Sequence, residues 1–114
     1  NIYLSTEKDE FGIKGNVIDA IDLLLKNISN DNLKIFSCGP PGMMNAVRQY
    51  SEDKEIDCDL ALETIMACGV GICQGCTIVK KGSNKDTYRE KYALACIDGP
   101  IFNIKELDNA NINH

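Results

Sequence analysis

Short apolar runs and amphipathic stretches alternate in the first half of the chain. Residues 2–5 and 33–37 are short and apolar, which is typical of buried strands. Apolar residues recur at helical spacing over 17–28, with Asn16 as a candidate N-cap, and a second helix is predicted over 43–50. This order of strand, loop and helix, repeated once, predicts part of a parallel, doubly wound sheet with an incomplete edge.

The second half of the chain has shorter apolar runs and more turn residues. Strands are predicted at 58–62, 77–79 and 92–97. A loop rich in Gly and Cys fills 66–75, and a polar excursion fills 80–91. The predicted class is therefore α/β: a partial nucleotide-binding lobe, followed by a small β-rich lobe.

A charged link at 51–55 marks the predicted boundary between the two lobes. We expect residues 1–54 to be the C-terminal part of a pyridine-nucleotide-binding domain and 55–107 to be a cluster-binding domain. Residues 108–114 are rich in Asn and are predicted to be a mobile tail. Because the chain lacks an initiator Met and opens directly in a strand-like run, we interpret it as a piece of a longer protein.

Composition narrows the function classes. The formal net charge of -5 disfavours nucleic-acid binding, because phosphates attract a basic surface. No apolar run approaches the roughly 18–20 residues that a membrane span needs. The first residues lack the basic segment of a signal peptide, so a cytoplasmic location with reduced thiols is expected. Six cysteines in a chain of 114 residues then indicate metal binding more than disulfides.

Four cysteines carry the clearest signal. Cys68, Cys73 and Cys76 have the spacing C-x4-C-x2-C, and Cys96 follows at a distance. This is the plant-type pattern of a 2Fe–2S cluster. Three ligands on one tight loop can surround two irons from one side, and the fourth must come from another segment. Loop glycines let the backbone approach the sulfurs and direct N–H groups towards them.

Alternatives to the cluster remain. Cys73 and Cys76, with two more cysteines, could form a four-thiolate zinc site, although structural zinc sites usually pair two close knuckles and Cys96 has no near partner. A disulfide would need an oxidising compartment, and a thioredoxin-like C-x-x-C would need a preceding βα unit that is missing here. Cys58 lies in a predicted strand and is interpreted as a small buried hydrophobe.

Cys38, Gly39 and Pro40 follow a predicted parallel strand. Ligands bind at the carboxyl ends of such strands in α/β sheets, so this turn is a candidate cofactor contact. The alternative is that Cys38 is a buried structural residue.

Two stretches resemble a known family. Residues 36–44 are similar to the late Cys-Gly-Pro motif of ferredoxin-reductase-type pyridine-nucleotide domains. Residues 62–76 together with 96–102 resemble the cluster domain of one branch, the electron-transfer subunit of NAD-dependent dihydroorotate dehydrogenase. The run Met-Ala-Cys-Gly-x-Gly-x-Cys, with Asp-Gly-Pro-x-Phe after the last cysteine, is specific to that branch.

The resemblance implies a function. In that family, electrons pass between NAD, FAD, a 2Fe–2S cluster and the FMN of a catalytic partner, which oxidises dihydroorotate to orotate in pyrimidine synthesis. The implied partner is this flavin-containing dihydroorotate dehydrogenase subunit, in a hetero-oligomer. The family's FAD-binding barrel and first Gly-rich loop have no counterpart here, so FAD is expected in the full-length protein and not in this chain alone. The excursion at 80–91 is longer than the family usually has.

The resemblance also assigns residues. It implies that Cys68, Cys73, Cys76 and Cys96 are the cluster ligands. It places Cys38, Gly39 and Pro40 near the nicotinamide. Glu7 would follow the first strand near the adenosine ribose, where a carboxylate suits the 2′-hydroxyl of NAD better than the 2′-phosphate of NADP. A solvated loop charge beside Lys8 is the alternative for Glu7.

No residue is expected to act as a general acid, base or nucleophile, and the single His114 lies in the predicted tail. Within redox proteins, related subunits serve sulfide dehydrogenases and ferredoxin:NADP oxidoreductases. Outside them, the chain could be a zinc-stabilised interaction module. If a partner docks at the cluster, Val70, Ile72 and Gln74 are expected at the contact, unless Val70 and Ile72 fold inward and shield the cluster from water.

Overall fold

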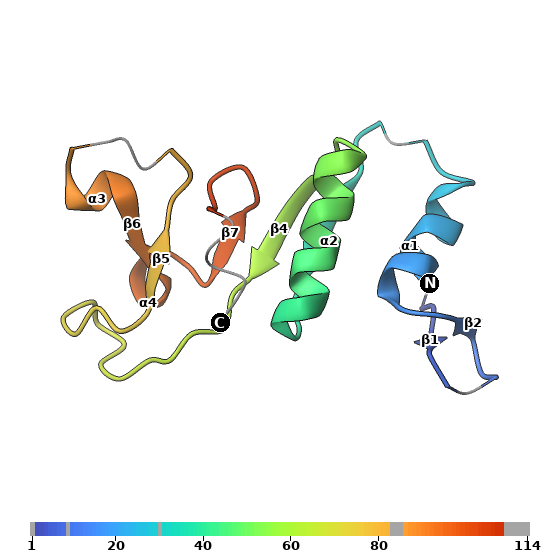
Figure 1. Ribbon diagram of the computed structural model, residues 1–114, viewed down its shortest axis with the longest axis horizontal. Helices are drawn as coiled ribbons and strands as arrows, with labels where there is room; N and C mark the ends of the chain where they lie inside the picture. Colours follow the sequence, from blue (N-terminus) through green and yellow to red (C-terminus); the bar gives the residue numbers. More distant parts are fainter. Residues whose placement is uncertain (1, 9, 30, 83–85, 109–114) are drawn as a thin grey trace.

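The computed structural model describes residues 2–8, 10–29, 31–82 and 86–108. Figure 1 shows an elongated chain, with the N-terminal elements at one end, α2 and β4 in the middle and the β5–β6 hairpin at the other end. The elements, in chain order, are β1 (Ser5–Thr6), β2 (Ile13–Lys14), α1 (Val17–Leu25), β3 (Lys34–Ser37), α2 (Pro41–Asp53), β4 (Asp57–Ala61), β5 (Thr77–Val79), α3 (Tyr88–Lys91), β6 (Tyr92–Leu94), α4 (Ala95–Asp98) and β7 (Ile101–Asn103).

The first helix begins as the sequence predicts. The Asn16 side chain accepts hydrogen bonds from the N–H groups of Ile18 and Asp19 at 2.9 and 3.1 Å, and the Asp19 carboxylate accepts from the Asn16 N–H at 2.9 Å. This reciprocal capping box satisfies N–H groups that the helix itself cannot pair. Helix α1 ends at Leu25, before the predicted end at residue 28, because the N–H of Ile28 bonds the nearer carbonyl of Leu25 in a tightened last turn.

The prediction of a buried strand at 2–5 is wrong. Strand β1 starts only at Ser5, and it pairs in parallel with β2, which lies inside the predicted loop. The two form a separate two-stranded sheet, and Ile2 is 91% exposed. In the described part of the chain, this small sheet shares no ladder with β3, so the first apolar run has no second layer to bury it.

The central sheet has the order β3–β4–β7. Strands β3 and β4 are parallel, as the sequence predicts, and β7 returns antiparallel to β4. Helix α2 contacts both β3 and β4. Strand β3 has no second neighbour among the described strands, which agrees with the predicted incomplete edge. The architecture is therefore a set of mixed sheets covered by helices.

Strand β4 lies just after the predicted boundary at 54/55. It pairs with β3 on one side and with β7 on the other, so the central sheet takes strands from both sides of that boundary. The division into two lobes stays a prediction. In the predicted tail, residues 109–114 lie outside the described residues, whereas the N–H of Asp108 donates to the carbonyl of Val79 at 3.1 Å.

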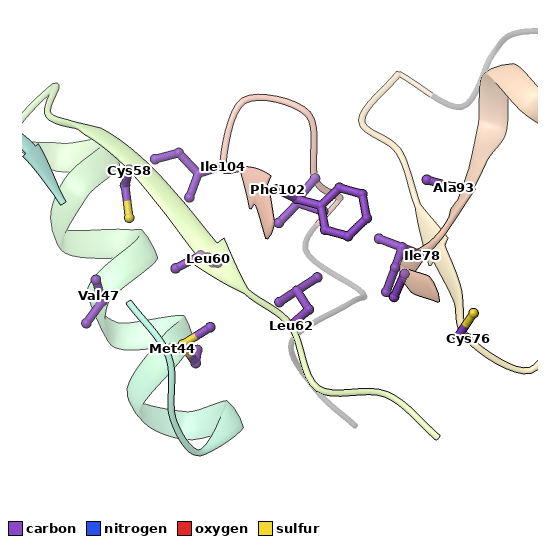
Figure 2. Close-up of a cluster of buried hydrophobic side chains, with 12 residues drawn as sticks. Met44, Val47, Cys58, Leu60, Leu62, Cys76, Ile78, Ala93, Phe102 and Ile104 are labelled. Atoms are coloured by element: carbon purple, nitrogen blue, oxygen red, sulfur yellow. The ribbon is translucent and has the colours of Figure 1, made fainter. Parts of the chain in front are cut away.

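One hydrophobic core connects the two halves of the chain. Figure 2 shows that side chains of α2 and β4 lie on one side of Phe102, and those of the β5–β6 hairpin on the other. Val47 and Leu60 belong to the first group, Ile78 and Ala93 to the second, and all four are buried. Burial of this apolar surface therefore fixes the hairpin relative to the central sheet.

The segment around Cys96 differs from the prediction. The strand predicted at 92–97 ends at Leu94, and Cys96 lies in the short helix α4. The reason is local, because the Asp98 carboxylate accepts a hydrogen bond from the Leu94 N–H at 2.8 Å and closes a helical turn. The excursion at 80–91 also contains an unpredicted helix, α3.

Within the residues that the structure describes, no helix is both long and apolar enough to cross a membrane.

Candidate metal centre

The predicted ligands lie on two segments that a backbone hydrogen bond joins. Cys68, Cys73 and Cys76 occupy the irregular connection between β4 and β5, and Cys96 is on α4. The Ala95 N–H donates to the Cys76 carbonyl at 3.0 Å, which brings α4 against the end of the loop. Cys76 is buried, Cys68 and Cys96 are half-buried, and Cys73 is exposed.

The four thiols form two pairs. Cys68 and Cys73 are adjacent, because the Cys73 N–H donates to the Cys68 Sγ at 3.4 Å. Cys76 and Cys96 form a second pair, in which each thiol shifts the pKa of the other. The charge of Cys68 also contributes to the raised pKa of Cys96.

Backbone N–H groups favour the thiolate, which is the form that binds metal. The N–H groups of Cys73 and Val70 lower the pKa of the Cys68 thiol to about 6. The N–H of Cys96 lowers the pKa of Cys76 below its ordinary value. The neighbouring Cys76 thiol raises the pKa of Cys96 instead.

The loop backbone requires glycine at one point in particular. Gly71 has φ +80, and a Cβ there would collide with the Ile97 side chain that follows Cys96. Gly69 also has positive φ, at +69. These conformations let the N–H groups of Val70, Cys73 and Gly75 point at cysteine sulfurs, at 3.4 to 3.5 Å.

The donor set of the two thiol pairs bears on which metal group they could hold. In the described part of the chain, no three side chains of His, Cys, Asp or Glu converge as ligands of one metal ion. A structural zinc needs four ligands around one point, whereas a 2Fe–2S cluster needs two thiolates on each of two irons. The two thiol pairs, with N–H donors directed at the sulfurs of Cys68 and Cys73, fit the two-plus-two ligation of a two-iron cluster.

The predicted nucleotide contacts lie next to strands of two different sheets. Cys38, Gly39 and Pro40 lie between β3 and the start of α2, at the carboxyl end of a parallel strand. Cys38 is exposed, so its interpretation as a buried structural residue is wrong. Glu7 is exposed and follows β1, which belongs to a different sheet from β3. By contrast, Cys58 is fully buried, as predicted, and burial raises the pKa of its thiol.

The sequence did not reveal a contact between the loop and α3. The Tyr88 hydroxyl donates to the Gln74 Oε1 at 2.8 Å, between the second and third predicted ligands. Both residues line a cavity of about 330 Å³ with Gly71 and Ile97. The pattern Thr87-x-x-Glu90 is a capping-box signature that could have predicted α3. It could not have predicted that α3 contacts the cysteine loop.

Comparison with known proteins agrees with this geometry. Residues 63–108 match the model of the iron–sulfur cluster binding domain of dihydroorotate dehydrogenase B. This match covers the loop, all four paired cysteines and the β5–β6 hairpin. Over these residues, the chain is similar to that domain family.

Longer relatives extend the similarity to the first half of the chain. The chain is 33% identical over 108 residues to a probable dihydroorotate dehydrogenase B (NAD(+)) electron transfer subunit of Archaeoglobus fulgidus, covering 93% of this chain and 40% of the relative. It is 38% identical over 105 residues to the dihydroorotate dehydrogenase B (NAD(+)) electron transfer subunit of a Geobacillus strain, covering 92% of this chain and 37% of the relative. The chain thus spans about two fifths of the length of these relatives.

A solved structure has the same fold. A chain of the NADH-dependent reduced ferredoxin-NADP oxidoreductase, studied for flavin-based electron bifurcation, superposes with a TM-score of 0.74. The two sequences are 27% identical, and the match covers 95% of this chain and 35% of the other. The fold is therefore ferredoxin-reductase-like over nearly all of this chain.

Proposed function

We propose that this chain binds a 2Fe–2S cluster through Cys68, Cys73, Cys76 and Cys96. In the full-length protein, the cluster passes electrons between an NAD- and FAD-binding module and the FMN of a dihydroorotate-oxidising subunit. The observation that carries the proposal is the arrangement of the four thiols in two adjacent pairs, inside the segment that matches the iron–sulfur domain. The similarity to electron transfer subunits supports the assignment of the partner.

In this proposal, the residues of this chain would hold and tune the cluster. A bound cluster exchanges single electrons, whereas nicotinamide exchanges two, so a flavin must mediate between them. Cys68 and Cys73 would bind one iron, and Cys76 and Cys96 the other. The N–H groups that point at the sulfurs would stabilise the added negative charge of the reduced state.

The rest of the chain would serve the nucleotide side. We propose that residues 1–54 complete a pyridine-nucleotide-binding domain and that 55–107 form the cluster domain. In that arrangement, Cys38, Gly39 and Pro40 lie near the nicotinamide, and Glu7 faces the ribose once the remaining parts of the longer protein complete the sheet. The exposed position of Cys38 at the end of β3 supports this role.

The loop surface suits a partner. Val70 and Ile72 point outward, and Ile72 is 81% exposed, so the inward, shielding arrangement is not the one observed. Ile65 on the same loop is exposed too. Exposed apolar side chains beside a redox centre mark a contact site, and a short gap between cofactors requires contact there. We therefore propose that Val70, Ile72 and Gln74 lie at the interface with the flavin-containing subunit.

A charge at this surface should weaken the complex. We expect the full-length protein mixed with the dihydroorotate-oxidising subunit to reduce NAD with dihydroorotate. Ile72→Asp should lower the apparent affinity for that subunit about tenfold or more, because a desolvated, unpaired charge costs at least ~1.4 kcal/mol at an interface. The matched control is Ile72→Val, which stays apolar and should couple normally. Normal coupling by Ile72→Asp, with an intact cluster, would refute the interface.

A second function is favoured by the structural similarity to a ferredoxin-NADP oxidoreductase. In that case, the cluster would exchange electrons with ferredoxin. A sulfide-dehydrogenase role is the remaining redox alternative. If the wild-type mixture fails to oxidise dihydroorotate but reduces ferredoxin or polysulfide, the proposed partner is wrong.

A further inference from the structure

Gln74 has an unusual conformation at the centre of the cysteine loop. Its φ is +58, a backbone angle that residues other than glycine rarely adopt. Its backbone carbonyl accepts a hydrogen bond from Thr77 Oγ1 at 2.6 Å, and its side-chain Oε1 accepts one from Tyr88 at 2.8 Å. The next residue, Gly75, donates its N–H to the Cys73 sulfur at 3.5 Å. The conformation of Gln74 therefore determines whether that N–H reaches the sulfur.

Tyr88 is itself held in place. It is the first residue of α3, whose capping box joins the Thr87 hydroxyl to the Glu90 carboxylate at 2.6 Å. The Tyr88 ring packs against the Tyr92 ring of β6, with centroids 4.8 Å apart. Lys80 donates to the Arg89 carbonyl at 3.1 Å, which fixes the other side of the excursion. These contacts hold the Tyr88 hydroxyl in position to donate to Gln74.

We propose that Tyr88 is a positioning residue for the cluster: the excursion between the third and fourth cysteines holds the loop in its metal-binding conformation through the Tyr88–Gln74 hydrogen bond. The inference rests on the proposed iron–sulfur function. Positive φ at a residue other than glycine carries a cost, and it persists where surrounding contacts over-determine it. The Tyr88 and Thr77 hydrogen bonds supply those contacts from two directions.

The test compares two hydroxyl deletions. Tyr88→Phe removes the hydrogen bond and keeps the ring, whereas Tyr92→Phe keeps the ring pair and the Tyr88–Gln74 bond. In the full-length protein loaded anaerobically, we expect Tyr88→Phe to lose its cluster to a chelator about fivefold faster than wild type, as the loss of one net hydrogen bond allows. Tyr92→Phe should match wild type. The electron paramagnetic resonance line shape of the reduced cluster should change in Tyr88→Phe alone.

A double-mutant cycle separates positioning from general destabilisation. Gln74→Met removes the acceptor, so adding Tyr88→Phe to it should not speed cluster loss further. Additive effects, or a Tyr88→Phe variant that matches Tyr92→Phe in rate and line shape, would overturn the proposal.

If the wild-type protein contains no 2Fe–2S cluster, the proposed function is wrong. In that case, amide hydrogen exchange over residues 68–76 would test the Tyr88–Gln74 contact separately from the cluster. Exchange should be faster in Tyr88→Phe than in Tyr92→Phe, and equal exchange in the two variants would refute the contact.

Discussion

Replacing Cys76 with Ser should abolish the cluster. Cys76 is buried, is paired with Cys96, and has a thiol pKa lowered by a backbone N–H, so its sulfur is prepared to bind metal as a thiolate. A serine hydroxyl at the same place ionises far less readily and is a poor ligand for iron in a sulfur-rich site. Because changes to the outer shell of a metal site already cost about 10–100-fold in affinity, loss of a ligand should cost at least that much. The measurement is the visible absorption and iron content of the anaerobically prepared variant.

The same loss is expected for the other three members of the two pairs, in Cys68→Ser, Cys73→Ser and Cys96→Ser. The two remaining cysteines provide controls of opposite exposure. Cys38 is exposed on the turn before α2, and Cys58 is buried in β4. Cys38→Ser and Cys58→Ser should both keep the chromophore in the folded protein. If either control loses it, the ligand set is wrong.

The second large effect is on stability. Arg48 on α2 is only 2% exposed, and its Nη2 lies 3.5 Å from the Leu107 carbonyl and 3.1 Å from the Glu52 carboxylate. Its side chain thus ties the helix to the segment after β7. Arg48→Ala should destabilise the protein by about 2–3 kcal/mol, because it removes a buried aliphatic stem and leaves the Leu107 carbonyl without this donor. Denaturant unfolding, followed by circular dichroism, measures the change.

Arg48→Met distinguishes the stem from the charge. The buried Nε of Arg48 has no hydrogen-bond partner among the described residues, so part of the guanidinium is desolvated without compensation. Methionine keeps most of the stem and removes that cost, so its effect should stay below about 1 kcal/mol. Equal destabilisation by Arg48→Met and Arg48→Ala would show that the charged group, and not the packing of the stem, joins α2 to Leu107.

Local signals in the sequence predicted the elements that local contacts build. Helix α1 starts at Val17, after the N-cap Asn16, because a capping box needs only neighbouring residues, and β5 has the predicted bounds. The prediction failed at β1, where burial depends on a second layer that the apolar run alone does not reveal. It also failed at Cys96, because one carboxylate, that of Asp98, replaces a strand with a helical turn.

The site was predictable to the extent that ligand spacing encodes it. The spacing of the four cysteines indicated the loop and a distant fourth cysteine, and a backbone hydrogen bond from Ala95 to Cys76 joins the two segments that carry them. The contact between Tyr88 and Gln74 joins residues 14 positions apart across an excursion. No periodicity or spacing rule predicts such a contact, since it depends on how α3 packs beside the loop.

Metal and sulfide analysis of the purified protein tests the central claim most directly. Prepared without oxygen, the protein should be red-brown and contain about two irons and two inorganic sulfides per chain, as a 2Fe–2S cluster requires. Stoichiometric zinc with no inorganic sulfide would contradict the account and would identify the four cysteines as a structural zinc site instead.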